Sequence, residues 1–165
     1  MQNITTAVVI GRFQPFHNGH FSILKKIEKN QKIKKIIIII GSSQFKNTPD
    51  NLYSLSTRKK IIKLSLANQI KKKIIIKSCP DVFNDKLWLR KILKITGRNV
   101  VVYTGNPKVK NIFIKNKTKV IDIKKKIKIS GTSLRKFINN KKNIWQRYVS
   151  KKAINIINHE INRTN

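Results

Sequence analysis

Acidic residues and cysteine are both scarce in this chain, and each shortage excludes a class of site. Only 6 Asp and Glu occur in 165 residues. They are too scattered for a metal site built from protein side chains alone or for a pair of catalytic carboxylates. The single cysteine, Cys79, excludes an internal disulfide framework. Cys79 stands before Pro80 at the end of an apolar run, where we expect a packed small residue rather than a nucleophile.

Long apolar runs are also missing. The longest run, 36–40, is far shorter than the roughly 20 residues that a membrane-spanning helix needs. The first residues lack the charged and then apolar segments of a secretory signal. We therefore expect a cytoplasmic protein with no membrane partner. The length fits one domain, 1–165, whose core requires neither disulfides nor a structural metal.

The formal charge of +32, from 38 Lys and Arg, raises the question of a nucleic-acid partner. Lysines occur in every segment instead of one block. Aromatic residues, 7% of the chain, are not interleaved with the basic runs as a base-stacking surface requires. Ile, Lys and Asn dominate together, as AT-rich codons would produce. We expect no specific nucleic-acid partner, although this charge attracts polyphosphates, and RNA nonspecifically, in a salt-dependent way.

Short β-branched apolar runs alternate with helical patterns along the chain. This alternation predicts the α/β class: a single Rossmann-like, doubly wound domain with a five-stranded parallel sheet and C-terminal helices. The expected strands are about 4–10, 35–40, 73–77, 100–103 and 119–123. The expected helices are about 19–30, 56–69 with Ser56 as its cap, 84–95, 109–114, 130–138 and 144–161. The last helix is expected to pack on the core, and 124–128 to form a solvated connector.

One segment, 11–20 with the sequence GRFQPFHNGH, joins an expected strand to an expected helix. Phe21, Leu24 and Ile27 fall on one face of that helix. His17 and His20 therefore stand at a helix start, where unpaired backbone N–H groups and the positive end of the dipole attract phosphate. The segment predicts a nucleotide site, and the alternative is a loop histidine followed by a helix-capping histidine.

A second helix start, Ile129–Arg135, offers small hydroxyl residues, a glycine and an arginine one turn later. The guanidinium of Arg135 falls on the face of Thr132 and can bind a polyphosphate in bidentate fashion. Taken alone, this pattern also fits an ordinary capped helix.

Both segments resemble motifs of one enzyme superfamily. The first resembles the H-x-G-H signature of the nucleotidylyltransferases. Its full length resembles the archaeal-type nicotinamide-mononucleotide adenylyltransferases, and 129–135 resembles their I-S-x-T-x-x-R motif, which contacts the ATP phosphates. The segment 104–107, TGNP, resembles their S/T-G-N-P stretch near the ATP-binding end of the sheet. Aminoacyl-tRNA synthetases share the first motif, but their closing lysine-rich K-M-S-K-S loop is absent here.

The resemblance implies an enzyme that joins nicotinamide mononucleotide to the AMP moiety of ATP, giving NAD and pyrophosphate. A phosphate monoester is already a nucleophile near neutral pH, so an activated serine, cysteine or general base is not required. Catalysis then depends on in-line positioning and on neutralising the charge of the transferring and leaving phosphates. We expect Mg²⁺ to arrive on ATP and no metal to be held by the protein alone. Relatives are commonly homo-oligomers, and the resemblance leaves this state open for the chain.

The resemblance also implies roles for individual residues. The catalytic residues are expected to be His17, His20 and Arg135. The ATP-binding residues are expected to be Gly11, Arg12, Phe13, Gly19, Thr104, Gly105, Asn106, Ser130 and Thr132. The residues that bind the second substrate are expected to be Lys46, Asp81, Asn84, Asp85 and Trp88. In the family a tryptophan stacks on the cationic nicotinamide ring, while the alternative for Trp88 is a place in the core.

The segment 45–56 departs most from the family pattern. Asp50 stands where a phosphate-contacting basic residue is often found, and Lys46 is the residue expected to compensate. Two other functions stay open. One is nucleotide transfer to another phosphate acceptor, phosphopantetheine or FMN, against which Arg12–Pro15 and Trp88 argue. The other is a basic RNA-associated protein on a degenerate scaffold.

Overall fold

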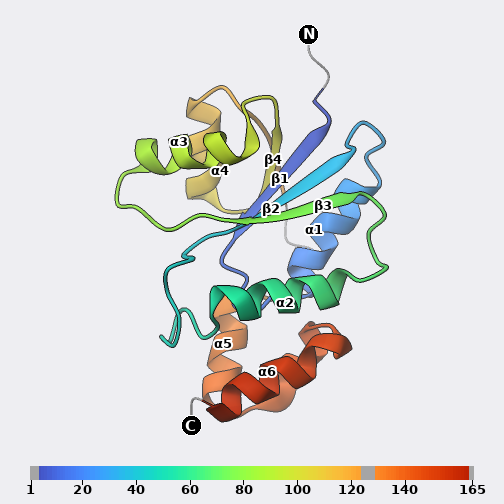
Figure 1. The fold of residues 1–165 in the computed structure, drawn as a ribbon, viewed down its shortest axis with the longest axis vertical. Coiled ribbons are helices and arrows are strands. Elements are labelled where there is room, and N and C mark those ends of the chain that lie inside the picture. Colours follow the sequence, from blue (N-terminus) through green and yellow to red (C-terminus); the bar gives the residue numbers. More distant parts are fainter. Residues whose placement is uncertain (1–3, 124–128, 164–165) are drawn as a thin grey trace.

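Strands and helices alternate along the chain in a computed structural model that describes residues 4–123 and 129–163 (Figure 1). The strands are β1 (Thr6–Gly11), β2 (Lys35–Ile40), β3 (Lys73–Ser78), β4 (Val101–Thr104) and β5 (Lys119–Asp122). The α-helices are α1 (Asn18–Glu28), α2 (Leu55–Leu66), α3 (Asp85–Thr96), α4 (Pro107–Lys115), α5 (Gly131–Asn139) and α6 (Lys151–Arg163). A 3₁₀-helix, η1 (Asn143–Tyr148), precedes α6. The expected connector at 124–128 lies outside the described residues.

The five strands form one parallel sheet in the order β3-β2-β1-β4-β5. The chain builds outward from β1 to β3, then returns to the other side of β1 and builds outward again to β5. The direction reverses between β1 and β4, which creates a switch point at their carboxyl ends. This topology confirms the predicted doubly wound α/β fold.

Helices cover both faces of the sheet. Alternate residues of a strand point to opposite faces, so neighbours in β1 enter different cores. Val9 belongs to the larger core, together with Leu24 of α1, Ile61 of α2 and Leu134 of α5. Val8 belongs to the smaller core, which contains side chains of α3 and α4. Figure 1 shows α3 and α4 on one side of the sheet and α1, α2, α5 and α6 on the other. The central strands are therefore buried on both faces.

The structure corrects two expectations about helices. The helix expected over 144–161 is two helices, because Val149 is extended (φ −120°, ψ 163°) between η1 and α6. The carbonyl oxygen of Arg147 accepts a hydrogen bond from the side chain of Asn18 at 3.3 Å, a tertiary contact that a sequence pattern does not reveal. The cap of α2 is Ser54, whose side chain accepts from the backbone N–H of Thr57, while Ser56 lies inside the helix.

Candidate active site

A cavity of about 380 Å³ lies at the carboxyl ends of β1 and β4, next to the starts of three helices. Its walls include the expected nucleotide-binding residues Gly11, His17, Gly19, His20, Thr104, Gly105, Asn106 and Ser130. These residues come from three segments far apart in the sequence. The sheet topology brings them together at the switch point, where the sequence predicts a ligand.

Three helix N-termini contribute to this cavity, and each has a side-chain cap. The caps are His17 for α1, Asn106 for α4 and Ser130 for α5. Each cap satisfies only part of the first turn, and the positive end of each helix dipole remains directed at the helix start. Three such ends beside one cavity form a strongly anion-attracting environment. This is the electrostatic arrangement that a polyphosphate requires.

The two histidines of the first motif are held by the start of α1 itself. Nδ1 of His17 accepts the backbone N–H of Gly19 at 3.0 Å, and Nδ1 of His20 accepts the backbone N–H of His17 at 3.3 Å. A neutral imidazole that accepts at Nδ1 carries its proton on Nε2. The rings of Phe13 and Phe16 flank His20 at centroid distances of 4.7 and 5.5 Å. Both imidazoles are thus fixed with Nε2–H as their donor.

Gly19 is required by this arrangement. A Cβ atom at position 19 would lie 2.8 Å from Cε1 of His17 and 2.9 Å from its Nδ1, closer than real Cβ contacts. The third residue of the H-x-G-H signature is therefore glycine because the capping imidazole occupies that space. The spacing of the motif therefore reflects the packing of the His17 ring against Gly19.

Arg135 lies in the first turns of α5 and is only 4% exposed. Its guanidinium donates to Oγ1 of Thr132 at 3.1 Å and to the carbonyl oxygen of Gln14 at 3.4 Å. Burial lowers the pKa of Arg135, the nearby charge of Arg12 lowers it further, and Asp50 opposes both. The contact with Gln14 joins the two motifs, since Gln14 belongs to the first and Arg135 to the second.

Arg12 and Arg135 share one carboxylate. Oδ1 of Asp50 lies 3.0 Å from a terminal nitrogen of Arg135 and 3.7 Å from one of Arg12. The sequence marked Asp50 as a departure from the family pattern but did not predict this contact.

Arg58 was not among the expected site residues, although it matches the arginine that ends the family's loop pattern. Its guanidinium is fully buried in α2 and donates to backbone carbonyl oxygens of three loop segments, including those of Arg12 at 3.2 Å and Gly41 at 2.9 Å. Further acceptors are the carbonyl oxygens of Ser42, Phe45 and Ser54. Burial lowers its pKa, and the charge of Asp81 opposes that shift. A fully buried arginine bonded to carbonyl oxygens positions the loops around Arg12. In the sequence, the sign of this role is a charged residue on the apolar face of an expected helix.

A pair of reciprocal hydrogen bonds positions the first motif against the segment before α2. The side chain of Gln14 donates to the carbonyl oxygen of Tyr53 at 3.0 Å and accepts the backbone N–H of Tyr53 at 2.9 Å. Gln14 is 1% exposed. The glutamine of the motif is therefore a structural link between two loops.

The residues expected to bind the second substrate lie along 81–88, after β3. The carboxylate of Asp81 accepts the backbone N–H and the hydroxyl of Ser42, which follows β2. Asn84 caps α3, and Asp85 pairs with Lys108 at 3.0 Å. Trp88 is half-buried, packs against the smaller core and meets Phe113 of that core edge-on at a centroid distance of 6.0 Å. These contacts account for each residue structurally, and they do not place Trp88 in the cavity of the two histidines.

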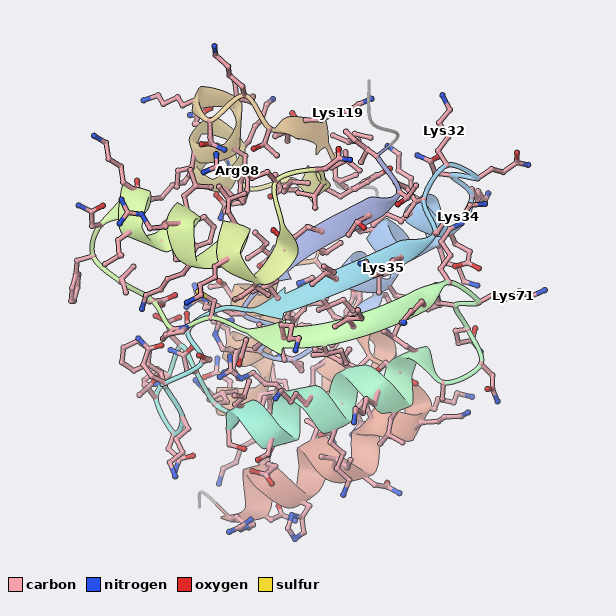
Figure 2. The ribbon with its side chains drawn as sticks, turned by 45° about the horizontal axis from the view of Figure 1, so that its top comes forward. Lys32, Lys34, Lys35, Lys71, Arg98 and Lys119 are labelled. Atoms are coloured by element: carbon pink, nitrogen blue, oxygen red, sulfur yellow. The ribbon has the colours of Figure 1, made fainter. Side chains whose placement is uncertain are left out.

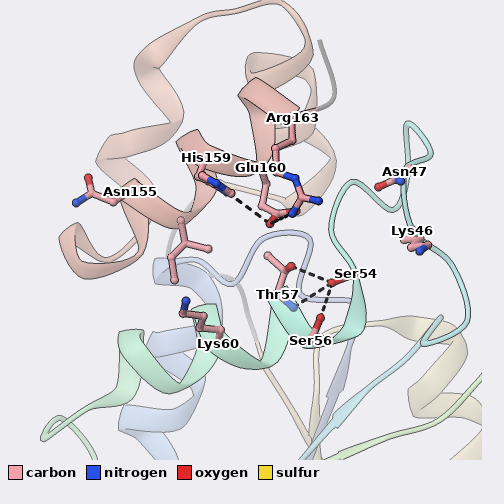
Figure 3. Close-up of a pocket in the computed structure, with 11 residues that line it drawn as sticks. Lys46, Asn47, Ser54, Ser56, Thr57, Lys60, Asn155, His159, Glu160 and Arg163 are labelled. Atoms are coloured by element: carbon pink, nitrogen blue, oxygen red, sulfur yellow. Dashed lines mark hydrogen bonds and ion pairs between the residues drawn. The ribbon is translucent and has the colours of Figure 1, made fainter.

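Lys46 lies in a different hollow, of about 750 Å³, between the start of α2 and α6 (Figure 3). Lys60, His159 and Arg163 share its walls, with Glu160 paired to Arg163 at 3.9 Å. At the start of α2 the hydroxyl of Ser54 bonds to those of Ser56 and Thr57, as the dashed lines in Figure 3 show. The structure does not bring Lys46 to the cavity lined by His17 and His20.

The positive charge of the chain is spread over the molecule. Basic side chains at the amino ends of the strands, opposite the cavity, are labelled in Figure 2: Lys32, Lys34, Lys35, Lys71, Arg98 and Lys119. Positive charge therefore lies at both ends of the strands, beside the cavity at Arg12 and Arg135 and at the opposite end.

Within 4–123 and 129–163, there is no group of three His, Cys, Asp or Glu side chains arranged to hold a metal ion. No helix in these ranges combines the length and the apolar character needed to cross a membrane.

Comparison with known proteins gives a consistent result. A family model described as cytidylyltransferase-like matches residues 8–137. The nicotinamide-nucleotide adenylyltransferase of Methanococcus aeolicus is 34% identical over 156 residues, which are 92% of this chain and 87% of that protein. That of Picrophilus torridus is 33% identical over 153 residues, 92% and 89% of the two chains.

Solved structures agree in fold. A bifunctional NMN adenylyltransferase/ADP ribose pyrophosphatase from Francisella tularensis superposes with a TM-score of 0.81 at 25% identity. That match covers 96% of this chain and 50% of the other, so this chain spans half the length of the bifunctional protein. Nicotinic acid mononucleotide adenylyltransferase from Plasmodium falciparum, complexed with NaAD, superposes at 0.68 with 18% identity, covering 97% and 98% of the two chains. The family resemblance drawn from the motifs is confirmed.

Proposed function

The chain belongs to the cytidylyltransferase-like family, and we propose that it is a nicotinamide-nucleotide adenylyltransferase. It joins nicotinamide mononucleotide to the AMP moiety of ATP and releases pyrophosphate. The observation that carries the proposal is the meeting of three helix N-termini and two histidines, each held through Nδ1, at one cavity. Arg135 is bonded to Gln14, in the loop between β1 and α1. The curated relatives, which this chain matches over most of their length, are nicotinamide-nucleotide adenylyltransferases.

The reaction is an in-line displacement at the α-phosphorus of ATP. A phosphate oxygen of nicotinamide mononucleotide attacks, the bond between the α-phosphorus and the bridging oxygen breaks, and pyrophosphate leaves with that oxygen. His17 and His20 donate from Nε2–H to the phosphates, and Arg135 neutralises charge that accumulates on the leaving group. The chain supplies donors and positive charge, and the acceptor phosphate supplies the nucleophile.

The remaining site residues divide between the two substrates. Gly11, Arg12, Phe13 and Gly19 at the first motif, Thr104, Gly105 and Asn106 after β4, and Ser130 and Thr132 at α5 surround ATP. Asp81, Asn84, Asp85 and Trp88 serve the nicotinamide side, which the family motif supports and which lies at the same carboxyl edge of the sheet. Lys46 is the least supported member of the set, because it faces the second hollow.

Magnesium enters this scheme as part of the substrate, Mg·ATP. One related solved structure, the bifunctional Francisella tularensis protein, is complexed with AMP and a manganese ion. Among the residues described here, no cluster of three ligating side chains provides a protein-only cage. In this proposal the ATP phosphates supply most of the ligands, and the ion neutralises their charge.

One assay tests the proposal against its alternatives. The protein is incubated with ATP, Mg²⁺ and one acceptor at a time: nicotinamide mononucleotide, nicotinic acid mononucleotide, FMN or phosphopantetheine. We expect NAD from the first acceptor, identified by mass spectrometry, and its loss in a variant with His20→Ala and Arg135→Met, which excludes a contaminating enzyme. Product from FMN or phosphopantetheine alone would assign a different acceptor. Absence of product with every acceptor, together with tight salt-sensitive RNA binding, would contradict the proposal.

A further inference from the structure

Asp50 is one of only 6 acidic residues in the chain, and its carboxylate lies between two arginines of the proposed ATP site. Oδ1 is 3.0 Å from Arg135 and 3.7 Å from Arg12. The Arg135 side chain is 5% exposed, whereas that of Asp50 is 69% exposed. The carboxylate thus approaches the buried guanidinium from the solvent side.

The backbone places Asp50 at the tip of a tight turn. Thr48 and Asn51 exchange backbone hydrogen bonds at 3.2 and 3.0 Å, so that Pro49 and Asp50 form the two-residue tip between them. The neighbouring Asn47 has a positive φ of 53°, which asparagine tolerates better than most residues. Arg135, in contrast, is held by Thr132 and by the carbonyl oxygen of Gln14. Asp50 lies on an exposed loop and Arg135 on a fixed helix, so Asp50 is the partner that can move away.

A phosphate group and a carboxylate bind a guanidinium through the same N–H donors. Both anions therefore compete for the outward donor of Arg135 that Asp50 occupies. Leaving the carboxylate beside bound phosphate would place two anions in contact, which is unfavourable at this distance. Binding of a polyphosphate to the pair requires Asp50 to move away.

We propose that Asp50 is an internal anion that competes with polyphosphate for Arg12 and Arg135. This inference rests on the proposed function for the identity of the polyphosphate, which is ATP before the reaction and pyrophosphate after it. Asp50 leaves the arginines when ATP binds and returns to them as pyrophosphate departs. It thereby weakens the binding of both ligands and limits inhibition by the product in a chain whose charge of +32 otherwise retains anions.

The test is the affinity for inorganic pyrophosphate, measured by titration calorimetry with Asp50→Asn and Asp50→Ala. Partly exposed ion pairs contribute little, so we expect binding about three- to tenfold tighter than in the unchanged protein. Inhibition of NAD formation by pyrophosphate should strengthen by the same factor. The direction is diagnostic, because loss of a merely structural contact weakens binding or leaves it unchanged.

A matched control removes one negative charge elsewhere. Glu28 lies at the far end of α1 and accepts the backbone N–H of Lys71 at 3.0 Å, a bond that glutamine also accepts. Glu28→Gln should leave pyrophosphate affinity unchanged, and an equal gain in this variant would show a general charge effect and overturn the inference.

The remaining outcomes separate the inference from the function on which it rests. Unchanged or weaker pyrophosphate binding in both Asp50 variants, in a protein that forms NAD, would refute the role of Asp50 alone. Tighter binding in the Asp50 variants of a protein that forms no NAD would support the competition and refute the proposed reaction.

Discussion

The imidazole rings of His17 and His20 lie with their centroids 3.8 Å apart. Each ring also accepts a backbone N–H from the start of α1 through Nδ1. The two rings and the first turn of α1 therefore form one unit, in which movement of either ring disturbs the other.

Replacing His20 with alanine tests the catalytic role of this unit. We expect His20→Ala to lower kcat about 100- to 1,000-fold while changing the Kd for ATP much less, because a preorganised donor acts mainly on the developing charge. Steady-state kinetics and a direct binding titration measure the two quantities. His159→Ala, which changes an exposed histidine of α6, should leave both unchanged. Turnover of His20→Ala within a few-fold of the parent would show that the imidazole is not needed.

Gly19→Ala should damage the site without unfolding the protein. The added Cβ requires His17 to move from its capping position, since the ring atoms would be 2.8 and 2.9 Å away. We expect a loss of kcat of at least about tenfold from misplacement of the imidazole, with a nearly unchanged circular dichroism spectrum. Gly41→Ala is the control, because the nearest atom that its Cβ would meet outside the neighbouring residues is the carbonyl oxygen of Gly11, at 3.8 Å. Equal activity of the two variants would contradict the packing described for the motif.

Arg58→Lys should lower stability by more than about 2 kcal/mol, because lysine keeps a buried charge but cannot reach several carbonyl oxygens at once. Urea unfolding followed by circular dichroism measures the change. Arg90→Lys, at an exposed position of α3, should shift the free energy of unfolding by less than about 0.5 kcal/mol. A similar small shift for Arg58→Lys would mean that its carbonyl contacts contribute little.

Tyr53→Phe should change how stability depends on alkaline pH. Burial raises the pKa of Tyr53, and the charge of Glu160 raises it further. In the unfolded chain tyrosine ionises near pH 10, so above that pH the unfolded state releases a proton that the folded state retains. Stability therefore falls as pH rises above about 10. The Tyr53 hydroxyl also has no hydrogen-bond partner among the described residues.

The measurement is the free energy of unfolding of both proteins between pH 8 and about 11. Tyr53→Phe should be at least as stable as the parent near pH 8 and should lose less stability as the pH rises. Parallel curves for the two proteins would refute the assigned burial of the hydroxyl.

The fold was predictable because its signals are local. The run Ile36–Ile40 identified a central strand, and the order of strands and helices specified a parallel doubly wound sheet. The first motif and 129–135 each predict a helix start from their own residues. Their meeting at one cavity followed from the topology, since ligands of such sheets bind at the switch point.

The remainder depends on contacts between residues distant in sequence. Arg58 bonds to Arg12, 46 positions earlier, and Arg135 bonds to Asp50, 85 positions earlier. No periodicity or propensity encodes such pairs. The break before α6 likewise accompanies a tertiary contact, the hydrogen bond from the side chain of Asn18 to the carbonyl oxygen of Arg147.

The two outermost strands, β3 and β5, leave one side of their backbones without a neighbouring strand in the described sheet. Exposed ammonium groups stand along them, at Lys73 and Lys77 on one and at Lys119 on the other. Edge-to-edge pairing of these strands between two copies of the chain would bring like charges close together. Pairing of the sheet edges of two copies is thereby opposed by charge repulsion.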